Sequence, residues 1–166
     1  MQTGANDTAL APPLRIAQWL NTDDPPDLAS LRGRVVLIVA FQLLCPGCVS
    51  QGLPQANRIH QTFGSGDLQV LGLHSVFEHH DAQGPVTLSA FLHENRIRFP
   101  VAVDAPAERG PIPRTMQAYD LQGTPSLILI GRDGTLRNIQ FGHAPDLVLG
   151  AEIAKLLLEC PPAVQA

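Results

Sequence analysis

Two cysteines separated by two residues are the part of this sequence whose types and spacing point most directly to chemistry. Cys45-Pro46-Gly47-Cys48 follows an apolar, β-branched run, Val35–Phe41, which predicts a short strand buried on both faces. After the pair, apolar residues recur at steps of three and four, as on one face of a helix: Val49, Leu53, Ala56, Ile59 and Phe63. The pair therefore lies where a strand ends and a helix begins. Free N–H groups and the helix dipole favour a thiolate at that place, which indicates redox chemistry.

Thiol–disulfide exchange needs one exposed thiolate and a second thiol that resolves the mixed disulfide. We expect Cys45, the first at the helix N-terminus, to be the nucleophile and Cys48, one turn further on, to be the resolving thiol. Pro46 and Gly47 allow a tight turn and keep bulk away from the attacking sulfur. A plainer interpretation is two unreactive buried thiols or half a zinc site. The sequence has no second Cys-x-x-Cys pair, however, and its third cysteine, Cys160, lies in a C-terminal tail.

The elements that must position this pair are predicted from periodicity and from turn residues. Apolar, β-branched stretches predict an edge strand and five further strands, the last two forming a hairpin at Gly134: Leu14–Leu20, Val35–Phe41, Leu68–Val76, Phe99–Val103, Ser126–Ile130 and Thr135–Phe141. Helical spacing predicts a helix after the cysteines that is kinked at Pro54, and three more: Val86–Asn95, a short helix around 112–119, and Leu147–Leu158. This order indicates an α/β protein whose mixed sheet is covered on both sides.

Length and composition narrow the class of protein. A chain of 166 residues predicts one domain with a core of its own, and we expect a flexible lead-in over residues 1–13 and a tail over 160–166. The net charge of −4 argues against nucleic-acid binding. No apolar run approaches the roughly 18 residues of a membrane span, and no signal peptide is visible at the start of the sequence. We therefore expect a cytoplasmic protein, or a periplasmic one if a leader has been removed from the sequence. In a reducing compartment, a close cysteine pair is more often catalytic or metal-binding than structural.

Three separated features resemble the thioredoxin-like superfamily. They are the Cys45-Pro46-Gly47-Cys48 motif at a strand–helix junction, Gly123-Thr124-Pro125 directly before a strand, and the Gly134 hairpin with a terminal helix behind it. An inserted helix and strand, Val86 to Val103, is similar to that of the TlpA-like/redoxin branch, which is related to AhpC/TSA proteins. The resemblance implies that Pro125 is cis and that the Thr124 backbone lies beside Cys45, where an extended peptide could pair with it.

The same resemblance implies a thiol–disulfide oxidoreductase that needs no cofactor beyond its cysteines. Its partners would be a disulfide-containing protein substrate and an upstream electron donor, and in a reducing cytoplasm it would act as a reductase. Two residues depart from the family pattern: Leu44 stands where tryptophan is usual, and Val39 where many members have a buried acid that assists proton transfer. Both departures affect the expected efficiency of disulfide exchange and the choice of protein partner. If exposed, Leu43 and Leu44 form an apolar docking patch for a protein substrate.

Two alternatives remain open. Peroxiredoxins share this fold, but their peroxidatic cysteine follows a threonine or serine by three residues and a proline by six; Gln42 and Val39 occupy those positions before Cys45. A non-catalytic metal- or partner-binding module is the other alternative. We expect the histidines to be solvated or hydrogen-bonded and not to bind metal: His74, His79, His80 and His143. Glu78, Arg96 and Arg109 are expected on solvated faces.

Overall fold

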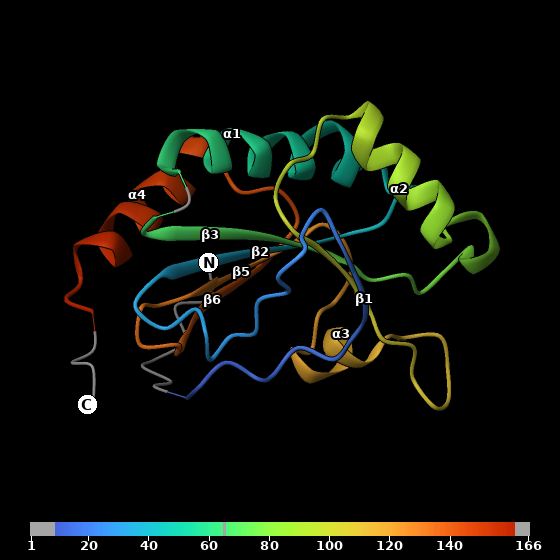
Figure 1. Ribbon diagram of the computed structural model, residues 1–166, viewed down its shortest axis with the longest axis horizontal. Coiled ribbons are helices and arrows are strands. Elements are labelled where there is room, and N and C mark those ends of the chain that lie inside the picture. Colours follow the sequence, from blue (N-terminus) through green and yellow to red (C-terminus); the bar gives the residue numbers. More distant parts are fainter. Residues whose placement is uncertain (1–8, 65, 162–166) are drawn as a thin grey trace.

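A six-stranded mixed sheet forms the centre of the protein, in a computed structural model that describes residues 9–64 and 66–161. The strand order is β1-β4-β3-β2-β5-β6 (Figure 1). The strands are β1 (Ile16–Leu20), β2 (Val35–Phe41), β3 (Leu68–His74), β4 (Val101–Asp104), β5 (Ser126–Ile130) and β6 (Leu136–Phe141). Strands β2, β3 and β4 are parallel, whereas β1, β5 and β6 pair antiparallel with their neighbours.

Helices cover both faces of this sheet. On one face lie α1 (Leu53–Phe63), α2 (Pro85–Glu94) and α4 (Asp146–Leu158); on the other lies α3 (Arg114–Ala118), next to the N-terminal part of the chain (Figure 1). A π-helical turn, Cys48–Gly52, leads into α1. A mixed sheet flanked by helices on both faces is the fold that the sequence predicted. No helix in the described part of the chain is long and apolar enough to cross a membrane.

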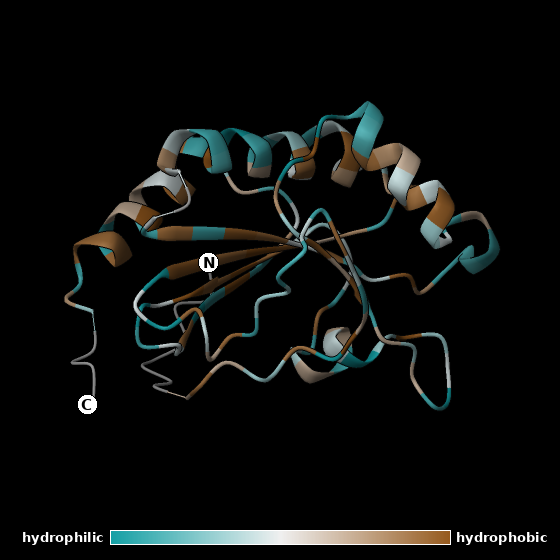
Figure 2. Ribbon diagram, viewed as in Figure 1, coloured by the Kyte–Doolittle hydropathy of each residue, from teal (hydrophilic) through white to brown (hydrophobic). Residues whose placement is uncertain are grey.

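Strand β2 lies at the centre of the core, and all seven of its side chains are buried. Val35, Leu37, Val39 and Phe41 point to the side of α1, α2 and α4, and the alternate residues point to the side of α3. Both faces of β2 are therefore apolar, which explains why its sequence is a continuous apolar run and does not alternate (Figure 2).

The predicted elements are present with small shifts of their ends, and Ser126–Ile130 is a strand with the predicted limits. Within the predicted flexible lead-in over residues 1–13, residues 9–13 contact the rest of the fold, and residues 1–8 lie outside the described part. Leu10 bridges Thr135, and the carbonyl of Ala9 accepts a hydrogen bond of 3.0 Å from Leu136 N–H. The Tyr119 hydroxyl donates to the carbonyl of Pro12. These contacts join the segment to the β5–β6 hairpin and to the end of α3.

Pro54 lies inside the continuous helical stretch that begins at Pro46 and ends with α1. A π-helical turn directly precedes it, in which the Leu53 N–H donates to the Cys48 carbonyl. A proline has no N–H to donate to the turn before it, and π-helical turns are one of the places where helices change direction. The helix is therefore irregular where the sequence predicted a disturbance by Pro54.

Candidate active site

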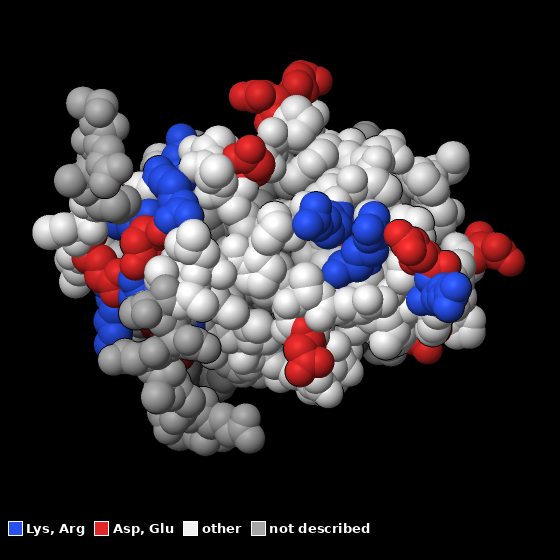
Figure 3. All heavy atoms as spheres, turned by 90° about the horizontal axis from the view of Figure 1, so that it is seen from below, with Lys and Arg blue, Asp and Glu red and all other residues white. Residues whose placement is uncertain are grey.

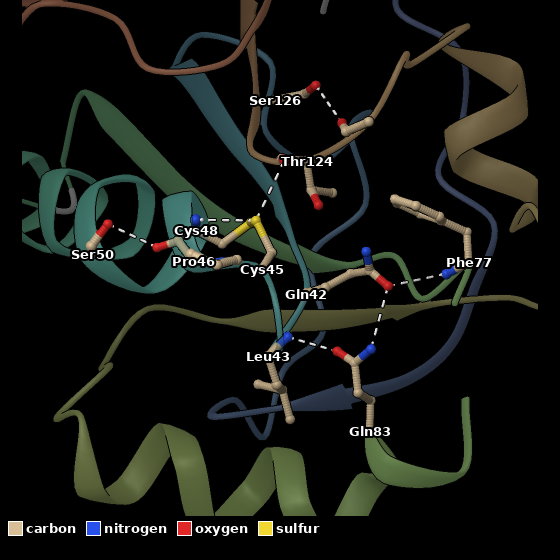
Figure 4. The surroundings of a disulfide bond; sticks show 11 residues. Gln42, Leu43, Cys45, Pro46, Cys48, Ser50, Phe77, Gln83, Thr124 and Ser126 are labelled. Atoms are coloured by element: carbon tan, nitrogen blue, oxygen red, sulfur yellow. Dashed lines mark hydrogen bonds between the residues drawn. A yellow bond between two sulfur atoms is a disulfide. The ribbon is translucent and has the colours of Figure 1, made fainter. Parts of the chain in front are cut away.

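Cys45 and Cys48 form a disulfide at the carboxyl end of β2, with their Cα atoms 5.2 Å apart (Figure 4). Cys45 is partly exposed, whereas Cys48 is completely buried. The sulfur that solvent or a substrate can reach is therefore that of Cys45. The roles of nucleophile for Cys45 and of resolving thiol for Cys48 stay predictions from the sequence.

Cys45 occupies the N-cap position of the helix that begins at Pro46. Its carbonyl accepts the first helical hydrogen bond, from Val49 N–H at 3.1 Å, and its Sγ lies 3.2 Å from the Cys48 backbone nitrogen, in position to accept that N–H. An N-cap side chain ordinarily supplies an oxygen for this donor. A negative charge on Cys45 Sγ would thus be stabilised by an N–H donor and by the helix dipole.

The loop before β5 lies opposite this sulfur. The Thr124–Pro125 peptide bond is cis, the isomer that the resemblance implied, and the Thr124 carbonyl oxygen lies 3.4 Å from Cys45 Sγ (Figure 4). The Ser126 hydroxyl donates to the Gly123 carbonyl at 2.7 Å and so holds the loop together. The structure therefore brings together the two sequence motifs, although 79 positions separate Cys45 from Thr124.

Two glycines of the helix face Pro125, and one of them permits a close approach. A Cβ on Gly47 would meet the Pro125 ring at 3.4 Å, an ordinary van der Waals contact. A Cβ on Gly52 would lie 3.1 Å from Pro125 Cβ, which is tighter than nine in ten real contacts of a Cβ. Gly52 therefore permits the close contact between the helix and the proline loop, a role that the sequence analysis missed.

A pair of buried glutamines supports the turn before Cys45, and the sequence analysis missed it too. Gln83 Oε1 accepts the Leu43 N–H at 2.7 Å, and its amide nitrogen donates to Gln42 Oε1 and to the Glu78 carbonyl. Gln42 Oε1 also accepts the Phe77 N–H (Figure 4). This network connects the active-site turn to the segment before α2. Gln42, directly after the apolar run Val35–Phe41, was a signal for it in the sequence, whereas Gln83 lies in a loop with no such signal.

The expected apolar patch is only half present. Leu44 is 55% exposed beside Cys45, as a docking residue must be, but Leu43 is only 8% exposed and packs in the core. The Leu43 N–H donates to Gln83 Oε1, so the backbone at this residue is held by a buried contact. Val39, at the position of the family's acid, is fully buried in the same apolar cluster as Cys48 and supplies no proton acceptor.

The histidines do not form a metal centre. In the described residues, no group of three or more His, Cys, Asp or Glu side chains is arranged to hold a metal ion. His79, His80 and His143 are exposed, as expected. His74 is buried, and its Nε2 has no hydrogen-bond partner among the residues that the structure describes. Glu78, Arg96 and Arg109 are exposed.

Charged side chains are sparse on the face that Figure 3 shows. The Lys and Arg groups there stand in separate small clusters, and most of them have Asp or Glu nearby. A surface that binds nucleic acid needs a continuous basic patch or stripe, and this face shows none.

A buried and an accessible cysteine at a helix N-terminus, facing a cis-proline loop on a mixed sheet, define the thioredoxin-like class with a site of the thiol–disulfide oxidoreductase type. The chain belongs to the AhpC/TSA family, whose model matches residues 11–139.

Two solved structures resemble the protein over nearly their whole length. One is a thioredoxin-like superfamily protein, SPOA0173, with 54% sequence identity, a TM-score of 0.90 and coverage of 92% of this chain and 99% of that one. The other is a thiol-disulfide isomerase from Corynebacterium glutamicum, with 48% identity, a TM-score of 0.88 and coverage of 92% and 98%. Protein DipZ of Mycobacterium bovis is 31% identical over 158 residues, which are 93% of this chain but 22% of DipZ. The chain thus spans about a fifth of the length of that curated relative.

Proposed function

We propose that the protein is a thiol–disulfide oxidoreductase that reduces or exchanges disulfides in protein substrates through a Cys45–Cys48 couple. One observation carries the proposal: the accessible Cys45 sulfur lies 3.2 Å from the Cys48 N–H donor and 3.4 Å from the Thr124 carbonyl, with Cys48 buried behind it. The similarity to a protein described as a thiol-disulfide isomerase supports the same class of reaction.

The reaction starts from the dithiol form. The Cys45 thiolate attacks one sulfur of the substrate disulfide, forms a mixed disulfide, and releases the other substrate sulfur as a thiolate that takes up a proton. Cys48, after losing its proton, attacks Cys45 Sγ. The mixed disulfide breaks, the Cys45–Cys48 disulfide forms, and the substrate leaves as a dithiol. The substrate has gained two electrons, and a separate dithiol donor must return two electrons to the protein.

The surroundings of Cys45 support an extended polypeptide as the substrate. The Thr124 backbone beside the sulfur offers a carbonyl to a peptide that lies across Pro125, as in strand addition. Leu44 and Pro46 are exposed next to Cys45 and provide uncharged contact area. Reduction is the direction we propose, in a reducing compartment such as the cytoplasm, where dithiols persist.

The peroxidase alternative receives no support from the residues before Cys45. Gln42 takes the place of the hydroxyl residue that a peroxidatic cysteine needs, and its oxygen accepts hydrogen bonds from Phe77 and Gln83. Val39, in place of the proline, is buried within β2. We therefore propose disulfide exchange and not peroxide turnover.

The proposal is tested with three cysteine variants in reduction of a model protein disulfide. We expect Cys45→Ser to abolish the reaction and Cys48→Ser to accumulate a mixed disulfide with the substrate, visible by intact mass. Cys160→Ser is the matched control: Cys160 is a free, exposed cysteine, and we expect the wild-type rate. A Cys45→Ser protein that still reduces the substrate at the wild-type rate would contradict the mechanism. Consumption of peroxide that depends on Cys45 would favour the peroxidase alternative.

A further inference from the structure

A groove lies between the N-terminal segment and the turn before β2, on the side of the sheet that α3 covers. The N-terminal segment runs below the sheet toward β1 in Figure 1. The volume of the groove is about 460 Å³, within the roughly 300–1,000 Å³ of small-molecule sites. None of the residues that line it is a cysteine, a member of the buried glutamine pair or part of the Thr124 loop.

The walls of the groove are apolar and held in place. Apart from Asp27, Arg32 and Gly134, every residue of the lining is apolar, and Trp19 of β1 is among them. The Ala11 N–H donates to the Gly134 carbonyl at 3.0 Å, which ties one wall to the β5–β6 hairpin. Prolines in the lining fix their own backbone, so the groove keeps its shape when a ligand enters: Pro13, Pro25 and Pro26.

Arg32 places a charged group at this groove. A Cβ on Gly134 would collide with the guanidinium atoms of Arg32, so the guanidinium packs directly on Gly134, and both residues line the groove. The backbone next to Arg32 is fixed as well, because the Gly33 N–H donates to the Arg132 carbonyl at 2.8 Å. Arg32 is nevertheless exposed, so a ligand can reach its N–H groups.

The charge of Arg32 has no partner in the described part of the chain. The arginine side chains that form ion pairs or donate hydrogen bonds there are those of Arg58, Arg132 and Arg137. Asp27 is the one acid of the lining, and its Oδ1 accepts the Ser30 N–H at 2.6 Å instead of pairing with Arg32. A guanidinium presents a planar fork of donors that fits the two oxygens of a carboxylate.

We propose that this groove binds a small organic carboxylate, with its apolar body against Trp19, Leu14 and Leu28 and its carboxylate paired with the Arg32 guanidinium. A neutral ligand would leave the guanidinium without a partner, and a cation would be repelled by it. The site stands apart from the redox proposal. Arg32 precedes β2 and Cys45 follows it, and the seven residues of this strand span roughly 20 Å at about 3.3 Å each.

The test compares octanoate with octanamide, which has the same apolar body without the charge. Affinity is measured by isothermal titration calorimetry, and the emission of Trp19 locates the ligand because Trp19 is the only tryptophan of the chain. We expect both compounds to shift the Trp19 emission to shorter wavelength as they displace water from the indole. Because Arg32 is exposed, the gain from its ion pair is modest, and we expect octanoate to bind about fivefold more tightly than octanamide.

Two arginine variants test the anchor. In Arg32→Leu we expect the affinities for the two compounds to become equal, while that for octanamide stays unchanged. Arg98→Leu is the matched control, because Arg98 is exposed, lies outside the groove and loses the same charge, and it should keep the fivefold preference. If Arg32→Leu does not fold, Ala29→Trp fills the groove from an exposed position of its lining, and calorimetry should then show no binding of either compound.

The other possible occupants are distinguished by two further measurements. Acetyl-leucyl-leucine carries its carboxylate on a peptide, and tighter binding of this peptide than of octanoate would assign the groove to a polypeptide C-terminus. A wild-type dimer that Ala29→Trp dissociates, seen by size-exclusion chromatography, would assign it to a second copy of the chain. Either result, equal wild-type affinities for octanoate and octanamide, or octanoate binding that survives Ala29→Trp would overturn the proposal.

Discussion

Replacing Gln83 with leucine tests whether the buried glutamine pair holds the active-site turn. The substitution nearly conserves volume but removes the acceptor of the Leu43 N–H at 2.7 Å, and that N–H is buried. Gln42 Oε1 loses one donor and keeps the Phe77 N–H at 3.3 Å. A buried donor left without a partner costs about 1–3 kcal/mol. We therefore expect the free energy of unfolding to fall by about 2 kcal/mol.

The Gln83→Leu substitution should also affect disulfide exchange, because Leu43 lies two residues before the nucleophile Cys45. Loss of its hydrogen bond frees the turn that places Cys45 Sγ against the Thr124 carbonyl. We expect disulfide exchange to slow by roughly tenfold, as small misplacements of reacting groups do.

Denaturant unfolding and the exchange assay are run on Gln83→Leu and on Gln61→Leu. Gln61 is exposed on α1, so the control makes the same chemical change on the surface and should stay within about 0.5 kcal/mol of wild type. A Gln83→Leu protein as stable and as active as Gln61→Leu would refute the argument.

Three further predictions follow from the structure. Gly52→Ala forces a Cβ to 3.1 Å from Pro125 and should cost about 1–3 kcal/mol of unfolding free energy, whereas Gly47→Ala, at 3.4 Å, should cost less than about 1 kcal/mol; equal losses would contradict this. His74 has its pKa lowered from 6.5 to about 4, so the unfolded chain binds more protons between these values and stability falls as pH falls. Relative to His74→Phe, the free energy of unfolding of the wild type should fall by about 2 kcal/mol between pH 7 and pH 5. The same dependence of unfolding free energy on pH in both proteins would contradict this prediction. Leu44→Trp should change the rate of exchange with protein disulfides but not with a small disulfide. Unchanged exchange rates with several protein disulfides would count against Leu44 as a docking residue.

Much of the fold follows from local pattern in the sequence. Val35–Phe41 is apolar on both sides because the sheet is covered on both faces, and this continuous run identified the central strand. Gly134, with φ of 75°, marked the turn between β5 and β6 because its conformation favours glycine. The two cysteines and Thr124-Pro125 were recognisable because their residue types are unusual just after or just before a buried strand.

The remainder depended on contacts between distant segments. Residues 9–13 carry no periodic pattern, and their observed contacts are with distant residues: Tyr119, Gly134, Thr135 and Leu136. Gln83 and Leu43 are 40 positions apart, and nothing local indicates that one accepts a hydrogen bond from the other. The burial of Leu43 beside an exposed Leu44 could not be predicted either, because Leu43 packs against core residues that are distant in the sequence.

The central claim is that Cys45 and Cys48 form one redox couple, and an equilibrium titration in glutathione buffers tests it most directly. The Cys160→Ser protein is used, so that only the pair can react, and thiols are alkylated and counted by intact mass. We predict a single two-electron transition in which two alkyl groups are lost together, and its absence in Cys45→Ser and in Cys48→Ser. A midpoint near about −270 mV would mark a reductase and one near about −120 mV an oxidant. Two thiols that remain alkylated across the whole range would contradict the claim.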